Sequence, residues 1–179
     1  MGERMRHNLL RLSLLICLTA SLTGQTAPWQ KYRNVAGNFA VLLPVEPKET
    51  TTGDTPATTS HTIQAIAEAV SYTIVYVTLD EEQEVTEANY KTYKEGVLKE
   101  LSTCTVLDEQ PAAPAIPGYI GRWYRMNCDI SNTKLTFVGN LYWGKHYAYA
   151  VLGMFATAPT DPPSIKKFVN SFGVIDASK

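Results

Sequence analysis

The chain has few of the side chains that bind metals or carry out nucleophilic catalysis. Of its 179 residues only three are histidine and three are cysteine, and an N-terminal leader accounts for one of each. The remaining histidines, His61 and His146, lie far apart and lack the H-E-x-x-H spacing of a zinc enzyme, which needs three protein ligands. No G-x-S-x-G segment marks a hydrolase nucleophile. We therefore expect no metal site, no cofactor and no catalytic residue.

Long hydrophobic runs and an excess of positive charge are also missing. After Gln25 no apolar run reaches the roughly 18 residues that a membrane-spanning helix needs, so we expect no stable membrane anchor. Removal of residues 1–24 takes away three Arg and one Glu, so the 16 Lys+Arg and 17 Asp+Glu fall to 13 and 16 and the formal charge becomes −3. A mildly acidic protein lacks the basic surface that nucleic acids and anionic lipids require.

The first 24 residues have the pattern of a secretory signal peptide. Arg4, Arg6 and Arg11 flank an apolar run made of residues 9–10 and 12–18, and small residues follow it. Ile16 stands before Cys17 where a lipoprotein would have a small residue. This order predicts export to the periplasm or the medium, with cleavage somewhere between residues 20 and 27.

Two cysteines, Cys104 and Cys128, remain after cleavage. If residues 104–110 pair with 118–128 around the loop Pro111–Gly118, the two cysteines lie almost opposite each other. An even number of cysteines in an oxidising compartment favours a disulfide over the alternative, two buried free thiols.

The rest of the chain, residues 29–176, predicts one domain made mostly of strands. A helix is expected over residues 86–101, where Tyr90, Tyr93, Val97 and Leu101 form one apolar stripe, and a second begins near Asp161. Strands are expected at residues 39–43, 48–52, 57 onward, 63–79 in two strands, 104–110, 119–129, 134–143, 145–155 and 174–175.

Two of these strands, residues 70–79 and 145–155, are apolar on both alternating sets of side chains. A strand of this kind is buried on both faces. Because short turns join successive strands, the sheet is expected to be mainly antiparallel. The sequence therefore predicts an α+β fold in which helices pack on both faces of one sheet.

The ends of this domain resemble the PsbP/Mog1-like family, particularly its secreted bacterial members. Gly37–Pro44 with Pro47 matches the family's opening G-x-F-x-V-x-x-P-x-x-P, and Ile165–Phe172 is similar to its closing F-x-x-S-F helix. The resemblance implies an α/β/α sandwich and a non-enzymatic role, because PsbP supports photosystem II and Mog1 binds a small GTPase. No functional residue transfers, since the matching positions are core and turn residues.

Arg122, Trp123 and Arg125 are the candidate binding residues. In a strand, Arg122 shares one face with Tyr124, and Trp123 shares the other with Arg125. Arginine beside an exposed aromatic suits recognition of carboxylates or of a protein partner. The alternative is that Trp123 belongs to the core and both guanidinium groups extend over aromatic surface to water.

Three functions remain open on this evidence. The first is an exported accessory module that binds an envelope or extracellular protein without catalysis. The second is a carrier that holds a small apolar ligand between helix and sheet. The third is an envelope hydrolase that uses His61 or His146.

Overall fold

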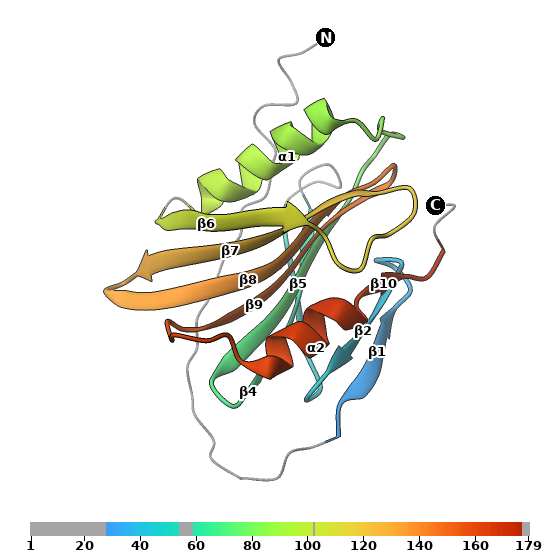
Figure 1. Cartoon of the computed structure of the whole chain (residues 1–179). Coiled ribbons are helices and arrows are strands. Elements are labelled where there is room, and N and C mark those ends of the chain that lie inside the picture. Colours follow the sequence, from blue (N-terminus) through green and yellow to red (C-terminus); the bar gives the residue numbers. More distant parts are fainter. Residues whose placement is uncertain (1–27, 54–58, 102, 177–179) are drawn as a thin grey trace.

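In the computed structural model, which describes residues 28–53, 59–101 and 103–176, the main sheet has seven antiparallel strands (Figure 1). Their spatial order is β3-β4-β5-β9-β8-β7-β6. The strands are β3 (Lys48–Thr52), β4 (Ser60–Ala67), β5 (Val70–Thr78), β6 (Cys104–Pro111), β7 (Ile120–Ile130), β8 (Thr133–Trp143) and β9 (Tyr147–Ala156). The predicted signal peptide, residues 1–24, lies outside the described residues.

Strands β5 and β9 lie inside the sheet and divide two apolar clusters. Ile74 of β5 and its partner Val151 of β9 belong to the cluster on one face, whereas Val75 and Ala150 belong to the cluster on the other. All four side chains are buried. The prediction that these two strands are covered on both faces is confirmed.

Helix α1 (Glu87–Glu100) covers one face of the sheet, over β7 and β8. It begins at Thr86, whose side chain accepts a hydrogen bond of 3.2 Å from the backbone N–H of Asn89 and so caps the helix. Tyr90, Tyr93 and Val97 are buried, which confirms the predicted apolar stripe. Within the described parts of the chain, neither helix is long and apolar enough to span a bilayer.

A second, smaller sheet covers the opposite face together with helix α2 (Pro163–Ser171). Its strands are β1 (Gln30–Asn34), β2 (Phe39–Leu43) and β10 (Gly173–Val174), in the order β1-β2-β10. Phe39, Val41 and Leu43 of β2 and Phe168 of α2 enter the same apolar cluster.

The predicted α/β/α sandwich, with helices on both faces of a single sheet, is therefore wrong. Strand accounts for 52% and helix for 16% of the structure, and a β-sheet forms much of the second layer. The reason lies in residues 30–34, for which the sequence predicts no strand. They pair with Phe39–Leu43 as a hairpin, and with β10 this hairpin forms a second sheet that packs on the same face as α2.

The predicted disulfide is confirmed. Cys104 and Cys128 stand opposite each other in the β6–β7 ladder and are joined, across a sequence separation of 24 residues. The bridge fixes the start of β6, the outermost strand on this side of the sheet.

Candidate functional site

The three predicted binding residues do not share one face of the sheet. Arg122 lies on the same side of β7 as Tyr124 and faces α1, because its guanidinium contacts Glu87 and the ring of Tyr90 on that helix. Trp123 lies on the other side, with α2. The alternation predicted for this strand is confirmed, and it separates Arg122 from the other two residues.

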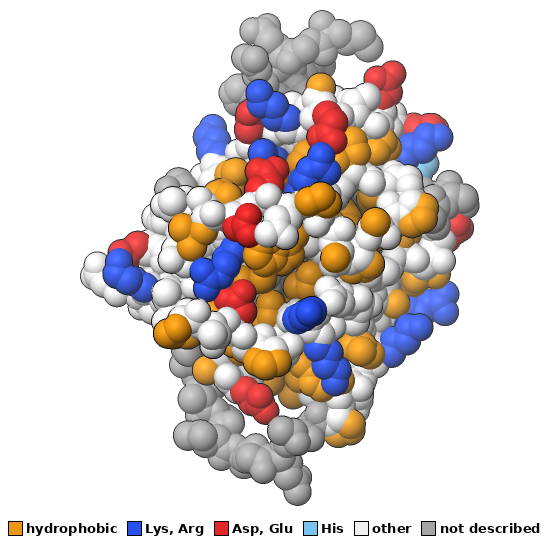
Figure 2. Space-filling view, in the orientation of Figure 1, with side chains coloured by type: hydrophobic (Ala, Val, Ile, Leu, Met, Phe, Trp, Pro, Cys, Tyr) orange, Lys and Arg blue, Asp and Glu red, His pale blue; other side chains and the backbone are white. Residues whose placement is uncertain are grey.

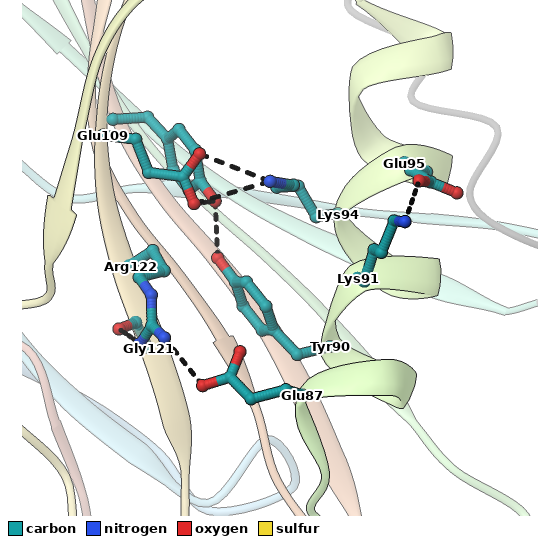
Figure 3. A network of polar contacts seen from close by, with 9 residues as sticks. Glu87, Tyr90, Lys91, Lys94, Glu95, Glu109, Gly121 and Arg122 are labelled. Atoms are coloured by element: carbon teal, nitrogen blue, oxygen red, sulfur yellow. Dashed lines mark hydrogen bonds and ion pairs between the residues drawn. The ribbon is translucent and has the colours of Figure 1, made fainter.

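Arg122 joins β7 to the first turn of α1. Its Nη2 donates to Glu87 Oε1 at 2.7 Å, and its guanidinium carbon lies 5.7 Å from the centre of the Tyr90 ring (Figure 3). Nη1 also donates to the carbonyl oxygen of Gly121 at 3.1 Å. These contacts hold the guanidinium group within the protein's own structure.

A chain of hydrogen bonds continues from this point toward β6. The hydroxyl groups of Tyr90 and Tyr124 are 2.8 Å apart, and the Tyr124 hydroxyl donates to Glu109 Oε1 at 2.9 Å. Lys94 of α1 approaches the same carboxylate at 3.3 and 3.4 Å (Figure 3). Burial raises the pKa of both tyrosines, and Glu109 raises that of Tyr124 further. The network fastens α1 to the sheet.

Arg125 anchors the segment that leads into α2. Its Nε and Nη2 both donate to Asp161 Oδ1, at 3.1 and 2.9 Å. The two side chains are only 25% and 32% exposed, so solvent screens this pair less than a surface pair. The carboxylate of Asp161 is thereby neutralised locally.

Trp123 borders an open groove between α2 and strands β7 and β8. The groove has a volume of about 490 Å³. Trp123, Pro162 and Pro163 provide its accessible apolar surface, whereas Val138, Ile165 and Val169 lie beneath it and are at most 4% exposed. Figure 2 shows this face hollowed, with hydrophobic side chains inside and charged groups around them. We name this feature the α2 groove. Its volume lies within the range of about 300–1,000 Å³ that is typical of small-molecule sites.

The rim of the α2 groove carries amides and two opposite charges. Gln110, Asp161, Lys166 and Asn170 contribute to its lining. Lys166 is exposed and, within the described part of the chain, forms no ion pair, whereas Asp161 is paired with Arg125. A second carboxylate lies beside this rim, because Asp108 stands opposite Arg125 in the β6–β7 ladder and accepts a hydrogen bond of 2.7 Å from Gln110.

The loop between β6 and β7 closes one end of the groove. Ala113 of this loop lines the groove, and its carbonyl oxygen accepts a hydrogen bond of 3.0 Å from Asn140 Nδ2. Asn140 is fully buried and stands opposite Trp123 in the β7–β8 ladder. A buried amide therefore holds the loop against the sheet where the indole lies.

Most of the other aromatic side chains in the described residues fill the interior. Tyr72, Tyr76, Tyr90, Tyr149 and Phe168 are each at most 3% exposed, and the rings of Tyr72 and Phe168 meet edge to face at 5.4 Å. Trp143 is also buried, and its Nε1 donates to the carbonyl oxygen of Glu84 at 3.2 Å. This packing counts against a carrier that encloses its ligand in a cavity between helix and sheet, and the groove beside Trp123 is open to solvent.

The two histidines lie in structural surroundings. The His61 ring stacks on Tyr76 with centroids 4.6 Å apart, and its Nδ1 lies 3.1 Å from Thr51 Oγ1. His146 lies in the turn between β8 and β9, where its carbonyl oxygen accepts from the backbone N–H of Leu79. Among the described residues, neither imidazole has a serine or carboxylate partner, and no three His, Cys, Asp or Glu side chains form a metal-binding group.

Both edges of the main sheet discourage pairing with another strand. Edge strand β6 has an irregular register between Val106 and Asp108 and ends at Pro111. Edge strand β3 has only five residues and carries the charged side chains of Lys48 and Glu49. Bulges, prolines and charges are the devices by which proteins protect open edges. The sheet edges are therefore poor binding surfaces.

Sequence reasoning identified Trp123 but not the segment that faces it. The sequence predicts Ile165 and Val169 as buried residues of the second helix, and this is confirmed, but it assigns no role to Lys166 at the rim of the groove. One signal was available in the sequence. The consecutive prolines 162 and 163 predict a rigid segment at the start of the helix, but they do not indicate which strand this segment packs against.

No protein-family model matches the chain, and no curated protein matches it either. The resemblance to PsbP/Mog1-like proteins stays a prediction.

Proposed function

We propose that this chain is an exported, non-enzymatic binding protein that holds a small apolar ligand in the α2 groove. The observation that carries the proposal is the position of Trp123, a half-buried indole in the wall of a groove of about 490 Å³. Most apolar aromatics of the main sheet are packed in the interior, whereas Trp123 borders open space. A large apolar side chain beside a few polar groups is the usual composition of a ligand site.

Docking of a protein partner through Arg122, Trp123 and Arg125 together has less support. Arg122 faces α1, and both arginines are engaged with carboxylates of the protein itself. A surface built from all three residues would have to extend over both faces of β7, so the envelope-protein partner is not the function that the geometry favours.

Two other parts of the proposal, export and a non-enzymatic role, are supported by separate observations. The N-terminal pattern is that of a signal peptide, and the Cys104–Cys128 bridge suits an oxidising compartment. The surroundings of His61 and His146 do not supply the serine and carboxylate that a hydrolase triad requires.

A neutral apolar dye tests the proposal. N-phenyl-1-naphthylamine fluoresces more strongly in apolar surroundings, and we expect it to bind the exported protein and to quench the indole of Trp123. Trp123→Ala should weaken this binding about tenfold, because it removes the largest apolar wall of the groove. Asn170→Trp, at the exposed rim, should weaken binding by filling the groove while leaving the core intact.

The matched control is Leu107→Ala. Leu107 is 51% exposed on β6 and does not line the groove, so its removal should leave dye binding unchanged. Equal dye binding by the wild-type protein, Trp123→Ala and Asn170→Trp would show that the α2 groove is not the site.

A further inference from the structure

Three neighbouring strands arrange the side chains beside the α2 groove in two rows. The first row, across β6, β7 and β8, is Gln110, Trp123 and Asn140, and the second is Asp108, Arg125 and Val138. Residues that stand opposite each other in a ladder share a face of the sheet and lie side by side. The indole of Trp123 therefore stands between two amides, and the charged residues of the sheet lie in the next row.

The charges beside the groove balance each other. Asp108 and Asp161 are the carboxylates, and Arg125 and Lys166 are the cations. Arg125 donates to Asp161 from both Nε and Nη2 and stands opposite Asp108 in the ladder. Figure 2 shows groups of both signs around the hollow. A ligand with a charge of either sign would meet a like charge here, so charge complementarity favours an uncharged ligand.

The apolar surface that a ligand can touch consists of rings. The indole of Trp123 and the ring of Pro162 are half-buried and that of Pro163 is exposed, whereas the aliphatic side chains beneath them are at most 4% exposed. A hydrocarbon chain would therefore find no enclosing aliphatic walls. An aromatic ring gains from stacking or edge-to-face contact with an indole beyond the area that it buries, and a rigid ring loses less conformational freedom on binding.

Gln110 adds a hydrogen-bond acceptor next to the indole. Its Nε2 donates to Asp108 Oδ2 at 2.7 Å. Because only the nitrogen of an amide can donate to a carboxylate, this contact determines which end of the amide Asp108 holds. The other end, Oε1, accepts no hydrogen bond from the described residues. A ligand that carries an O–H or N–H donor would match it.

We propose that the ligand of the α2 groove is an uncharged aromatic compound of the phenol or aryl-amine type, with its ring against Trp123 and Pro163 and its donor at Gln110 Oε1. This inference rests on the proposed function and adds the class of ligand to it. Because Gln110 and Trp123 are neighbours in one row of the sheet, a single fused-ring compound can reach both.

Competition with the bound dye tests the aromatic ring. 2-Naphthol and decahydro-2-naphthol share a fused carbon skeleton and a hydroxyl group and are uncharged at pH 7, but only the first is aromatic. We expect 2-naphthol to displace N-phenyl-1-naphthylamine at a concentration about fivefold lower. Trp123→Phe should keep this preference, whereas Trp123→Leu should abolish it, because leucine is apolar but has no ring.

A second pair of competitors tests the hydrogen bond. The oxygen of 2-methoxynaphthalene carries no proton, so its displacement of the dye should need a concentration about fivefold higher than that of 2-naphthol. Gln110→Ala should remove this difference. Gln30→Ala is the matched control, since Gln30 is an exposed glutamine on β1 that does not line the groove, and it should leave the difference intact. Sodium 2-naphthoate, which is charged, should displace the dye less well than 2-naphthol.

The outcomes separate the two proposals. Suppose that dye binding depends on Trp123. Equal displacement by 2-naphthol and its saturated analogue, a donor effect that survives Gln110→Ala, or better displacement by 2-naphthoate would then overturn the assigned class of ligand and leave the binding site standing. Dye binding that does not depend on Trp123 would overturn both.

Discussion

At the scale of single residues, Gly139 marks the closest approach between two central strands. It lies in β8 opposite Leu152 of β9. A Cβ atom at this position would overlap the carbonyl oxygen of Val151 and lie 2.9 Å from the Cα of Leu152. Because these atoms belong to the backbone of a buried strand, a change of rotamer cannot relieve the overlap.

We therefore expect Gly139→Ala to lower the free energy of unfolding by about 2–3 kcal/mol, the upper range for overpacking a core. Gly173→Ala is the control, because a Cβ there has nothing within 4 Å, and its effect should stay within about 0.5 kcal/mol. Urea denaturation followed by circular dichroism measures both. Equal stability of the two variants would mean that β8 and β9 have room to separate.

At the scale of elements, β6 depends on attachments at several points along its length. The disulfide fixes its start, Glu109 connects its middle to Tyr124 and Lys94, and the backbone N–H of Ala112 donates to the carbonyl oxygen of Gly121 just beyond its end. Because β6 is an edge strand, it pairs with only one neighbouring strand. The disulfide and these hydrogen bonds therefore add stabilisation that an inner strand obtains from pairing with a second strand.

Replacement of both cysteines should loosen this strand first. We expect Cys104→Ser with Cys128→Ser to lower the free energy of unfolding by roughly 3 kcal/mol, the value for a loop of about this size. Amide exchange should rise most in β6 and least in β5, which lies inside the sheet between two strands. A uniform increase in amide exchange throughout the sheet would show that the disulfide does not specifically stabilise β6.

The elements also show what a sequence can and cannot predict. The stripe of α1 and the two-sided apolar pattern of β5 and β9 are local signals, and each was predicted with its buried residues. Strand β1 carries no such signal, since Gln30 and Lys31 face solvent. Its pairing with β2 depends on the intervening turn, where Asn34 Oδ1 accepts from Gly37 N–H at 2.6 Å and Asn38 adopts a φ of 55°.

The site was only partly predictable for a related reason. Alternation along β7 places Trp123 and Arg122 on opposite faces, which follows from strand geometry alone. The segment that faces each of them comes from distant parts of the chain: Glu87 lies 35 residues before Arg122, and Asp161 lies 36 residues after Arg125. Periodicity carries no information about such pairs.

At the scale of the whole molecule, tyrosine is the most widely distributed titratable group of the interior. Of the ten tyrosines, nine have a raised pKa, and burial is the largest cause in each case. Tyr32, which donates a hydrogen bond to Glu49, reaches a pKa of about 12. The tenth, Tyr147, is half-buried at the start of β9.

The protein should therefore lose stability in alkali. In the unfolded chain these hydroxyls ionise near pH 10, whereas in the folded protein they keep their protons, so the unfolded state binds fewer protons above pH 10 and the free energy of unfolding falls as pH rises. The stability that the protonated tyrosines contribute is fully present below pH 10 and is lost as the pH rises above it. Absorbance at 295 nm should show few tyrosinates at pH 10.5 before unfolding and a cooperative increase with it. Gradual ionisation of most tyrosines in folded protein would contradict this.

The division of the interior by the main sheet has a consequence for how the protein can change during evolution. The cluster under α1 and the cluster under α2 are built from different side chains, even where both come from the same strand. Substitutions in contact with one cluster are therefore expected to add to, rather than depend on, those in the other. Substitutions around Trp123 can therefore change the α2 groove, while the side packed against α1 preserves the fold.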